Sequence, residues 1–267
     1  MNMTSHHKRI ATALLLIPLL LGLLYMGHVV QTLIVAVIAL LGLWEFYKLF
    51  WTGKNRLHLR FLGVAGGTLF LLDSGLGWTS SPVLFLVIFF WITCLLFLAE
   101  YSRKHEQAEF RDYLILMGGI FYLPLVLSLI FNLSELEILL VLMAAFASDT
   151  GAYYAGNRWG GKKIWPDISP KKTWAGSFGG LILCLLVTLG TGLLLGHASL
   201  WQFLVLGLLM NIGAQMGDFF QSSLKRWNKV KDSGNILPGH GGILDRIDSL
   251  LLLLPVYVLY NTLFHLL

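Results

Sequence analysis

Long apolar runs recur along this chain, and they constrain its fold more than any other feature. A helix that crosses a bilayer needs about 20 mostly apolar residues. Such runs are separated here only by short clusters of Lys, Arg, Gly, Pro, Asn and Asp. Of the 267 residues, 57% are hydrophobic and 12% are charged, whereas ordinary soluble domains have about 45–50% and 25%. The chain therefore has more apolar surface than one soluble core can bury, which predicts a membrane protein.

We predict an all-α, polytopic integral membrane helix bundle with about nine transmembrane helices. The predicted spans are residues 10–26, 29–50, 61–78, 83–99, 113–131, 137–156, 177–196, 200–224 and 248–266. The third span contains Asp73 and several glycines, so it could be tilted or broken. The first span resembles a signal peptide, but no small-residue cleavage site follows it, so we interpret it as a retained helix.

The positive charges follow this topology. With nine spans and a cytoplasmic amino terminus, all 19 Lys and Arg residues fall on the cytoplasmic side. The connections on the other side contain none, which is the asymmetry expected of membrane proteins. The net charge of +5 is explained by this topology alone, so we expect no nucleic-acid partner. We therefore expect the catalytic side of the protein to face the cytoplasm.

We expect one integral membrane domain over residues 1–267. Residues 1–135 are predicted to be mainly a lipid-embedded helical scaffold, and residues 136–267 a catalytic half, because carboxylates and cations concentrate at helix ends there. Cys94 and Cys184 lie inside apolar runs without metal-ligand spacing, so we interpret them as packing residues. The chain has no internal repeat, which weakens the architecture of many secondary transporters.

A polar stripe marks the end of the eighth predicted span. Asn211, Gln215, Asp218 and Ser222 recur at helical spacing and lie on one face. For Asn211 and Gln215, hydrogen bonding between helices is an equally good explanation. Asp218 differs, because an ionised carboxylate near hydrocarbon is costly unless it is paired or binds a metal. We therefore predict a functional role for Asp218.

Two further carboxylates lie where the last span begins. Asp245 and Asp248 are three residues apart and can project from one helical face toward Asp218. Either residue alone could instead be structural, because an acidic side chain stabilises the amino-terminal end of a helix. Together the three carboxylates provide only oxygen ligands, which suit Mg²⁺ and phosphoryl chemistry. We predict a Mg²⁺ site at Asp218, Asp245 and Asp248.

A second polar cluster extends over residues 148–180. It brings Asp149 and Asn157 near the membrane boundary and Lys171 and Lys172 into a Ser-Pro-Lys-Lys-Thr segment. Residues 156–162 match the first positions of a P-loop, but Lys163 replaces the required Ser or Thr and an apolar span precedes it, so we exclude a Walker site. Simple positive-inside markers remain an alternative for these lysines. His240, in a Gly-rich run, could bind pyrophosphate or only support the turn.

The two clusters together closely resemble the phosphatidate cytidylyltransferase (CDP-diacylglycerol synthase) family. The carboxyl-terminal signature of that family is filled at the following positions: Ser222, Lys225, Arg226, Lys231, Asp232, Gly234, Pro238, His240, Gly241, Gly242, Asp245, Arg246 and Asp248. Its Asp-Thr-Gly-Ala-Tyr and Ser-Pro-Lys-Lys-Thr segments are matched at residues 149–153 and 169–173. One position departs from the family, because Ala175 stands where a Glu is usual.

The resemblance implies transfer of CMP from CTP to phosphatidic acid. The protein would lie in the inner membrane of a prokaryote, in contact with membrane lipids. It implies Mg²⁺ at Asp218 and Asp245, and a second cation, K⁺ or another Mg²⁺, involving Asp248. The expected catalytic cations are Lys225 and Arg226. The expected substrate-binding residues are Asp149, Asn157, Lys171, Lys172, Ser222, Lys231, His240 and Arg246. A homodimer is left open.

Three other classes are weaker alternatives. An ion or substrate transporter would need polar residues continuing toward the outer face, where the later spans are almost uniformly Leu, Ile and Val. A CDP-alcohol phosphotransferase would show a closely spaced Asp-Gly, Ala-Arg and paired-Asp signature, which this chain does not have. A non-catalytic scaffold would not explain the costly carboxylates at the boundary.

Overall fold

The chain folds as a set of long helices joined by short connections. The computed structural model describes residues 26–51, 56–79, 81–234 and 241–267. Among these residues the only β-type pairing is an isolated bridge between Lys163 and Thr173. The helices are α2 (His28–Phe50), α3 (Leu57–Leu76), α4 (Pro82–Lys104), η1 (His105–Gln107), α5 (Phe110–Ile120), η2 (Phe121–Leu125), α6 (Val126–Ser128), η3 (Leu129–Asn132), α7 (Glu135–Trp159), α8 (Trp174–Leu195), α9 (Leu200–Trp227) and α10 (Leu244–Phe264). The all-α prediction is confirmed.

Eight helical segments within the described residues are long and apolar enough to cross a membrane. Each overlaps one of the predicted spans from the second to the ninth, so the chain is a multi-pass membrane protein. The first predicted span lies outside the described residues except for its last residue, so the count of nine and the orientation of the amino terminus stay predictions. The third span is one continuous helix, and Asp73 near its end accepts hydrogen bonds from the Thr79 backbone N–H and hydroxyl, both at 2.8 Å.

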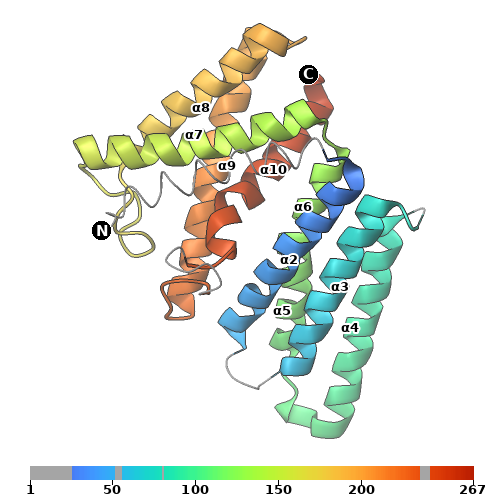
Figure 1. Cartoon of the computed structure of the whole chain (residues 1–267). Coiled ribbons are helices and arrows are strands. Elements are labelled where there is room, and N and C mark those ends of the chain that lie inside the picture. Colours follow the sequence, from blue (N-terminus) through green and yellow to red (C-terminus); the bar gives the residue numbers. More distant parts are fainter. Residues whose placement is uncertain (1–25, 52–55, 80, 235–240) are drawn as a thin grey trace, which may run out of the picture.

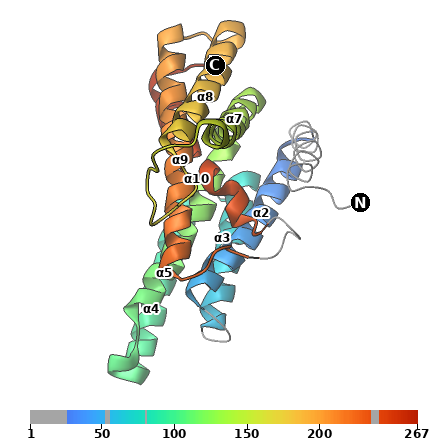
Figure 2. The same ribbon diagram turned by 90° about the vertical axis from the view of Figure 1, so that its left-hand side faces the viewer.

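The helices form two groups with α10 between them (Figure 1). Helices α2 to α6 lie side by side in one group, and α7, α8 and α9 make up the other. Helix α10 packs along α9 and also contacts α7, α2 and α6. Figure 2, turned by 90°, again shows α9 beside α10 and α2 beside α3. The last helix therefore connects the predicted scaffold to the predicted catalytic half.

The span over Phe110–Asn132 is not a regular helix. Its middle turn, η2, is a π-helical turn that contains Pro124, whose ring and missing N–H disturb regular helical hydrogen bonding. This turn directs Tyr122 toward α9, where its hydroxyl lies 3.5 Å from Gln221 Oε1 and its ring meets Phe220 edge-on. A local departure from α-helical winding thus brings the first helix group against α9.

Helices α7 and α8 cross very closely because glycines line the crossing. A Cβ atom on Gly151 would lie 2.3 Å from the carbonyl oxygen of Gly179, and one on Gly179 would lie 2.2 Å from Ala155 Cβ. The chain enters α8 through Thr173, whose hydroxyl accepts the Gly176 N–H at 3.1 Å, as is typical of a helix amino-terminal cap. These contacts place residues 160–173, the α7–α8 loop, beside α9.

Replacing Gly151 by alanine should destabilise the protein. The added methyl has no space against a backbone carbonyl, and overpacking of this kind typically costs about 1–3 kcal/mol. Thermal unfolding in detergent should show a lower midpoint. The matched control is Gly190→Ala in α8, where no atom lies within 4 Å of the added Cβ and alanine favours the helix by about 1 kcal/mol. Equal midpoints for the two variants would contradict the tight crossing.

Candidate active site

An ion pair between two distant segments is the centre of the candidate site. Lys172, in the α7–α8 loop, lies with its Nζ 2.7 Å from Asp218 Oδ2 on α9. The Ser222 hydroxyl, one turn along α9, donates to Asp218 Oδ1 at 3.2 Å. Lys172 Nζ also lies 4.3 Å from the centre of the Phe219 ring. Asp218 therefore has the partner that an ionised carboxylate at a membrane boundary requires.

The rest of the polar stripe on α9 holds helices together. Asn211 Oδ1 accepts the Ser148 hydroxyl of α7 at 2.8 Å. Gln215 exchanges two hydrogen bonds with Ser177 of α8, at 2.5 and 3.3 Å. These are the bonds between helices that were the alternative interpretation of Asn211 and Gln215. Their effect is to fix the rotation of α9, which turns Asp218 toward the α7–α8 loop.

Three carboxylates from three helices share one electrostatic environment. Asp149 of α7, Asp218 of α9 and Asp248 of α10 are close enough that their charges repel one another. The buried Ser249 hydroxyl lies 3.3 and 3.4 Å from the two Asp149 carboxylate oxygens. The charges of Lys172 and Arg246 offset part of the repulsion at Asp149. This arrangement favours a cationic ligand or additional cationic side chains.

The close approach of α9 to α10 explains why two of these carboxylates are neighbours. A Cβ atom on Gly217 would lie 2.3 Å from the carbonyl oxygen of Asp248 and 3.2 Å from Ser249 Cα. Only glycine allows this backbone contact without displacement of a helix. Asp218 follows Gly217 directly, so the backbone of Asp218 lies beside the first turns of α10.

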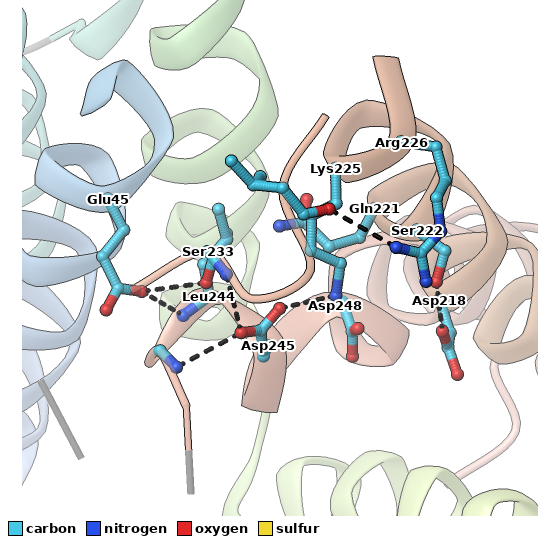
Figure 3. Close-up of polar contacts among 12 residues, drawn as sticks. Glu45, Asp218, Gln221, Ser222, Lys225, Arg226, Ser233, Leu244, Asp245 and Asp248 are labelled. Carbon is cyan, nitrogen blue, oxygen red and sulfur yellow. Dashed lines mark hydrogen bonds and ion pairs between the residues drawn. The ribbon is translucent and has the colours of Figure 1, made fainter. Parts of the chain in front are cut away.

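Asp245 is bound differently from the other acids (Figure 3). Its Oδ1 accepts Lys225 Nζ of α9 at 2.6 Å, and both side chains are mostly buried, at 13% and 11% exposure. Its Oδ2 accepts the backbone N–H groups of Ser233 at 3.0 Å and Gly242 at 3.2 Å. Asp245 thus ties α9 to both described ends of residues 228–243, the α9–α10 loop.

The other predicted site residues are distributed around this centre. Arg226 donates to the carbonyl oxygens of Ile168 at 3.3 Å and Val230 at 3.4 Å, so it holds the α7–α8 loop against α9. Lys171, Lys231 and Asn157 are exposed on the same two loops and the end of α7, and Arg246 is exposed in the first turn of α10. His240 lies outside the described residues. Ala175 lies in the first turn of α8, which contains no acidic residue.

The donor set fits a hard cation. Asp149, Asp218 and Asp248 provide only oxygen ligands, which Mg²⁺ prefers. Among the described residues, no three His, Cys, Asp or Glu side chains are close enough to hold one metal ion together. Mg²⁺ usually takes one or two carboxylates and completes its shell with water and phosphate oxygens. The carboxylates present are compatible with that mode of binding.

Sequence reasoning missed one acidic residue of this region. Glu45 on α2 is 1% exposed and accepts hydrogen bonds from Ser233 and Leu244, at the two ends of the α9–α10 loop. The signal that identified Asp218 applied to Glu45 as well, because it is a lone carboxylate inside an apolar run. No local pattern links Glu45 to this site, because its partners lie 188 and 199 positions away in the sequence.

Comparison with known proteins gives consistent results. The chain is similar to phosphatidate cytidylyltransferases from Staphylococcus epidermidis, with 44% identity over 120 residues that cover 45% of this chain and 46% of the relative. The enzyme of the same name from Bacillus subtilis is 45% identical over 111 residues, 41% of each chain. The alignments thus span a little under half the length of the curated relatives. The sequence model of the cytidylyltransferase family covers residues 7–264, and the chain therefore belongs to the cytidylyltransferase family.

Proposed function

We propose that this protein transfers the CMP group of CTP to phosphatidic acid, forming CDP-diacylglycerol and pyrophosphate. The observation that carries the proposal is the Lys172–Asp218 ion pair, flanked by Asp149 and Asp248, where three helices and a basic loop meet. The family membership and the relatives named phosphatidate cytidylyltransferase support the same reaction. The site is expected on the cytoplasmic face of an inner membrane, where CTP is available.

The chemistry makes modest demands on the protein. A phosphatidate oxygen attacks the α-phosphorus of CTP, a new P–O bond forms, and the bond from that phosphorus to the β-phosphate oxygen breaks to release pyrophosphate. A phosphate monoester has a second pKa of about 6, so the nucleophile is already largely dianionic at neutral pH. No general base is needed, and the task of the protein is to position the substrates and offset their charge.

The cations of the two loops suit that task. Lys172 and Lys225 are each paired with an aspartate, which sets the direction of their ammonium groups. Lys171, Lys231 and Arg246 are exposed and can approach phosphate oxygens from water. Arg226 would act mainly by holding the α7–α8 loop in place. The lipid tails of phosphatidic acid would remain in the bilayer beside the helices.

We propose that Mg²⁺ is held at Asp218 and Asp248, because no three acidic side chains of the described residues are close enough to share one ion; a role for Asp245, the other predicted ligand, stays a prediction. A Mg²⁺ ion held there would help to offset the charge that develops on the pyrophosphate leaving group. To bind Mg²⁺, Asp245 would have to share its carboxylate with Lys225, whose Nζ lies 2.6 Å from Asp245 Oδ1. A second cation, K⁺ or another Mg²⁺, and a homodimer stay predictions.

The full-length protein, purified in mixed micelles, should release pyrophosphate only when CTP, phosphatidic acid and Mg²⁺ are all present. The product lipid should be CDP-diacylglycerol by mass spectrometry. Omission of phosphatidic acid distinguishes transfer from simple CTP hydrolysis, because hydrolysis would continue without it. A folded preparation that releases no pyrophosphate with all three components would overturn the proposed reaction.

A further inference from the structure

Glu45 is a buried carboxylate of the first helix group, and it points toward the α9–α10 loop and the start of α10. It lies near the end of α2 and is 1% exposed. One of its oxygens, Oε2, accepts the backbone N–H of Leu244 at 2.9 Å and the hydroxyl of Ser233 at 3.3 Å. Burying a carboxylate in a membrane helix is costly. Glu45 is therefore stabilised mainly by groups at the two ends of the α9–α10 loop.

The contacts of Glu45 continue directly to the candidate site (Figure 3). Ser233, which donates its hydroxyl to Glu45, also donates its backbone N–H to Asp245. Asp245 in turn accepts Lys225 of α9. Leu244, the other donor to Glu45, is the first residue of α10 and the neighbour of Asp245. Two short chains of contacts thus join Glu45 to the Lys225–Asp245 pair.

Two glycines, one at each described end of the α9–α10 loop, bring the backbone close to the Glu45 carboxylate. A Cβ atom on Gly234 would lie 2.2 Å from Glu45 Oε1, and one on Gly242 would lie 2.4 Å from Oε2. At Gly234 the three nearest atoms all belong to the Glu45 side chain. The Glu45 carboxylate therefore explains the glycine at position 234. The glycine at position 242 is explained by Glu45 together with Ser233, whose Oγ would lie 2.2 Å from the added Cβ.

We propose that Glu45 is a positioning residue that fastens the α9–α10 loop to the first helix group and so fixes Asp245 and Lys225. The attachment of the loop is independent of the reaction, whereas its catalytic consequence rests on the proposed function. The predicted scaffold half would then take part in shaping the site. Glu45 does not need to touch substrate for this role.

The attachment is tested by hydrogen–deuterium exchange of residues 229–248 in the detergent-solubilised, full-length protein. Removal of the carboxylate in Glu45→Ala should speed exchange of this segment about tenfold or more, because the two hydrogen bonds that Glu45 accepts no longer oppose local opening. Glu45→Gln keeps an oxygen acceptor and should restore most of the protection. Unchanged exchange in Glu45→Ala would overturn the attachment.

Glu137→Ala is the matched control. Glu137 is also a buried carboxylate that binds α10, through Tyr257 at 3.1 Å and Asn261 at 2.5 Å, near the opposite end of that helix. Its loss should lower global stability without a selective increase of exchange in residues 229–248. Equal increases in the two alanine variants would mean general loosening and would overturn a specific role of Glu45.

Activity measurements separate the attachment from its consequence. Glu45→Ala should lower kcat on the order of 100-fold, as expected when charged groups are misplaced by about 1 Å, and Glu45→Gln should recover most of it. Gly234→Ala should mimic Glu45→Ala and add little to it in the double variant. Faster exchange with wild-type kcat would overturn the positioning role. A wild-type protein without activity would contradict the proposed function and leave the exchange result valid.

Discussion

Replacing Asp218 by asparagine should lower the rate of pyrophosphate release by about 1,000-fold. The change removes one charge from a proposed Mg²⁺ ligand and from the partner of Lys172 at 2.7 Å. Metal-based stabilisation of a transition state is worth several kcal/mol, and each 1.36 kcal/mol corresponds to about tenfold in rate. Initial rates at saturating CTP and phosphatidic acid, titrated with Mg²⁺, would measure the effect.

The Mg²⁺ titration also tells the carboxylates apart. Asp218→Asn and Asp248→Asn should both raise the Mg²⁺ concentration that gives half the maximal rate. Asp167→Asn is the matched control, because Asp167 is an exposed acid of the α7–α8 loop, which also carries Lys172. The rate of this variant should stay near that of the wild type. A rate for Asp218→Asn within tenfold of the wild type would rule out its proposed role.

Replacing Lys225 by methionine should destabilise the protein by about 3 kcal/mol, the cost of leaving one member of a buried pair alone. Among the described residues, Asp245 would then keep the backbone N–H groups of Ser233 and Gly242 as its donors. Chemical unfolding in detergent would give the free energy change. The rate should also fall, because both partners belong to the proposed site.

A double-mutant cycle tests whether the two side chains act as a pair. Lys225→Met with Asp245→Asn should be less destabilised than the sum of the single variants. The surface comparison is Lys104→Met, because Lys104 pairs with Glu100 while 53% exposed, and its loss should cost less than about 1 kcal/mol. Additive effects of Lys225→Met and Asp245→Asn would show that the ion pair contributes nothing to stability.

The Mg²⁺ dependence of the rate tests a different role for Asp245. A strongly raised Mg²⁺ requirement in Asp245→Asn would support Asp245 as a metal ligand.

Much of the fold could be predicted from the length and composition of the apolar runs. The eight predicted spans from the second to the ninth each match a described helix, because crossing a bilayer imposes a length and composition that are visible in the sequence. The π-helical turn at Phe121–Leu125 could not be predicted in detail, although Pro124 was visible. Proline indicates a local disturbance, but the packing of neighbours decides its form.

Sequence patterns proposed members of the candidate site but not their pairings. The cost of a carboxylate near the boundary singled out Asp218, the three-residue spacing added Asp245 and Asp248, and the second polar cluster with the family resemblance added Asp149. Which cation meets which acid depends on how the helices pack, so neither Lys172 with Asp218 nor Lys225 with Asp245 followed from spacing. The glycine at position 217 is another example, since its role is defined only by the backbone of α10.

The long sequence separation between Glu45 and Leu244 has a consequence for biogenesis. The two residues are 199 positions apart, so α2 is synthesised and inserted into the bilayer well before α10 exists. During that interval neither the Leu244 N–H nor the Ser233 hydroxyl is available to Glu45 as a hydrogen-bond donor. Insertion of α10 then satisfies Glu45 and assembles Asp245 and Asp248 in one event. A nascent chain that has not yet inserted α10 would therefore hold Glu45 without these two hydrogen-bond donors.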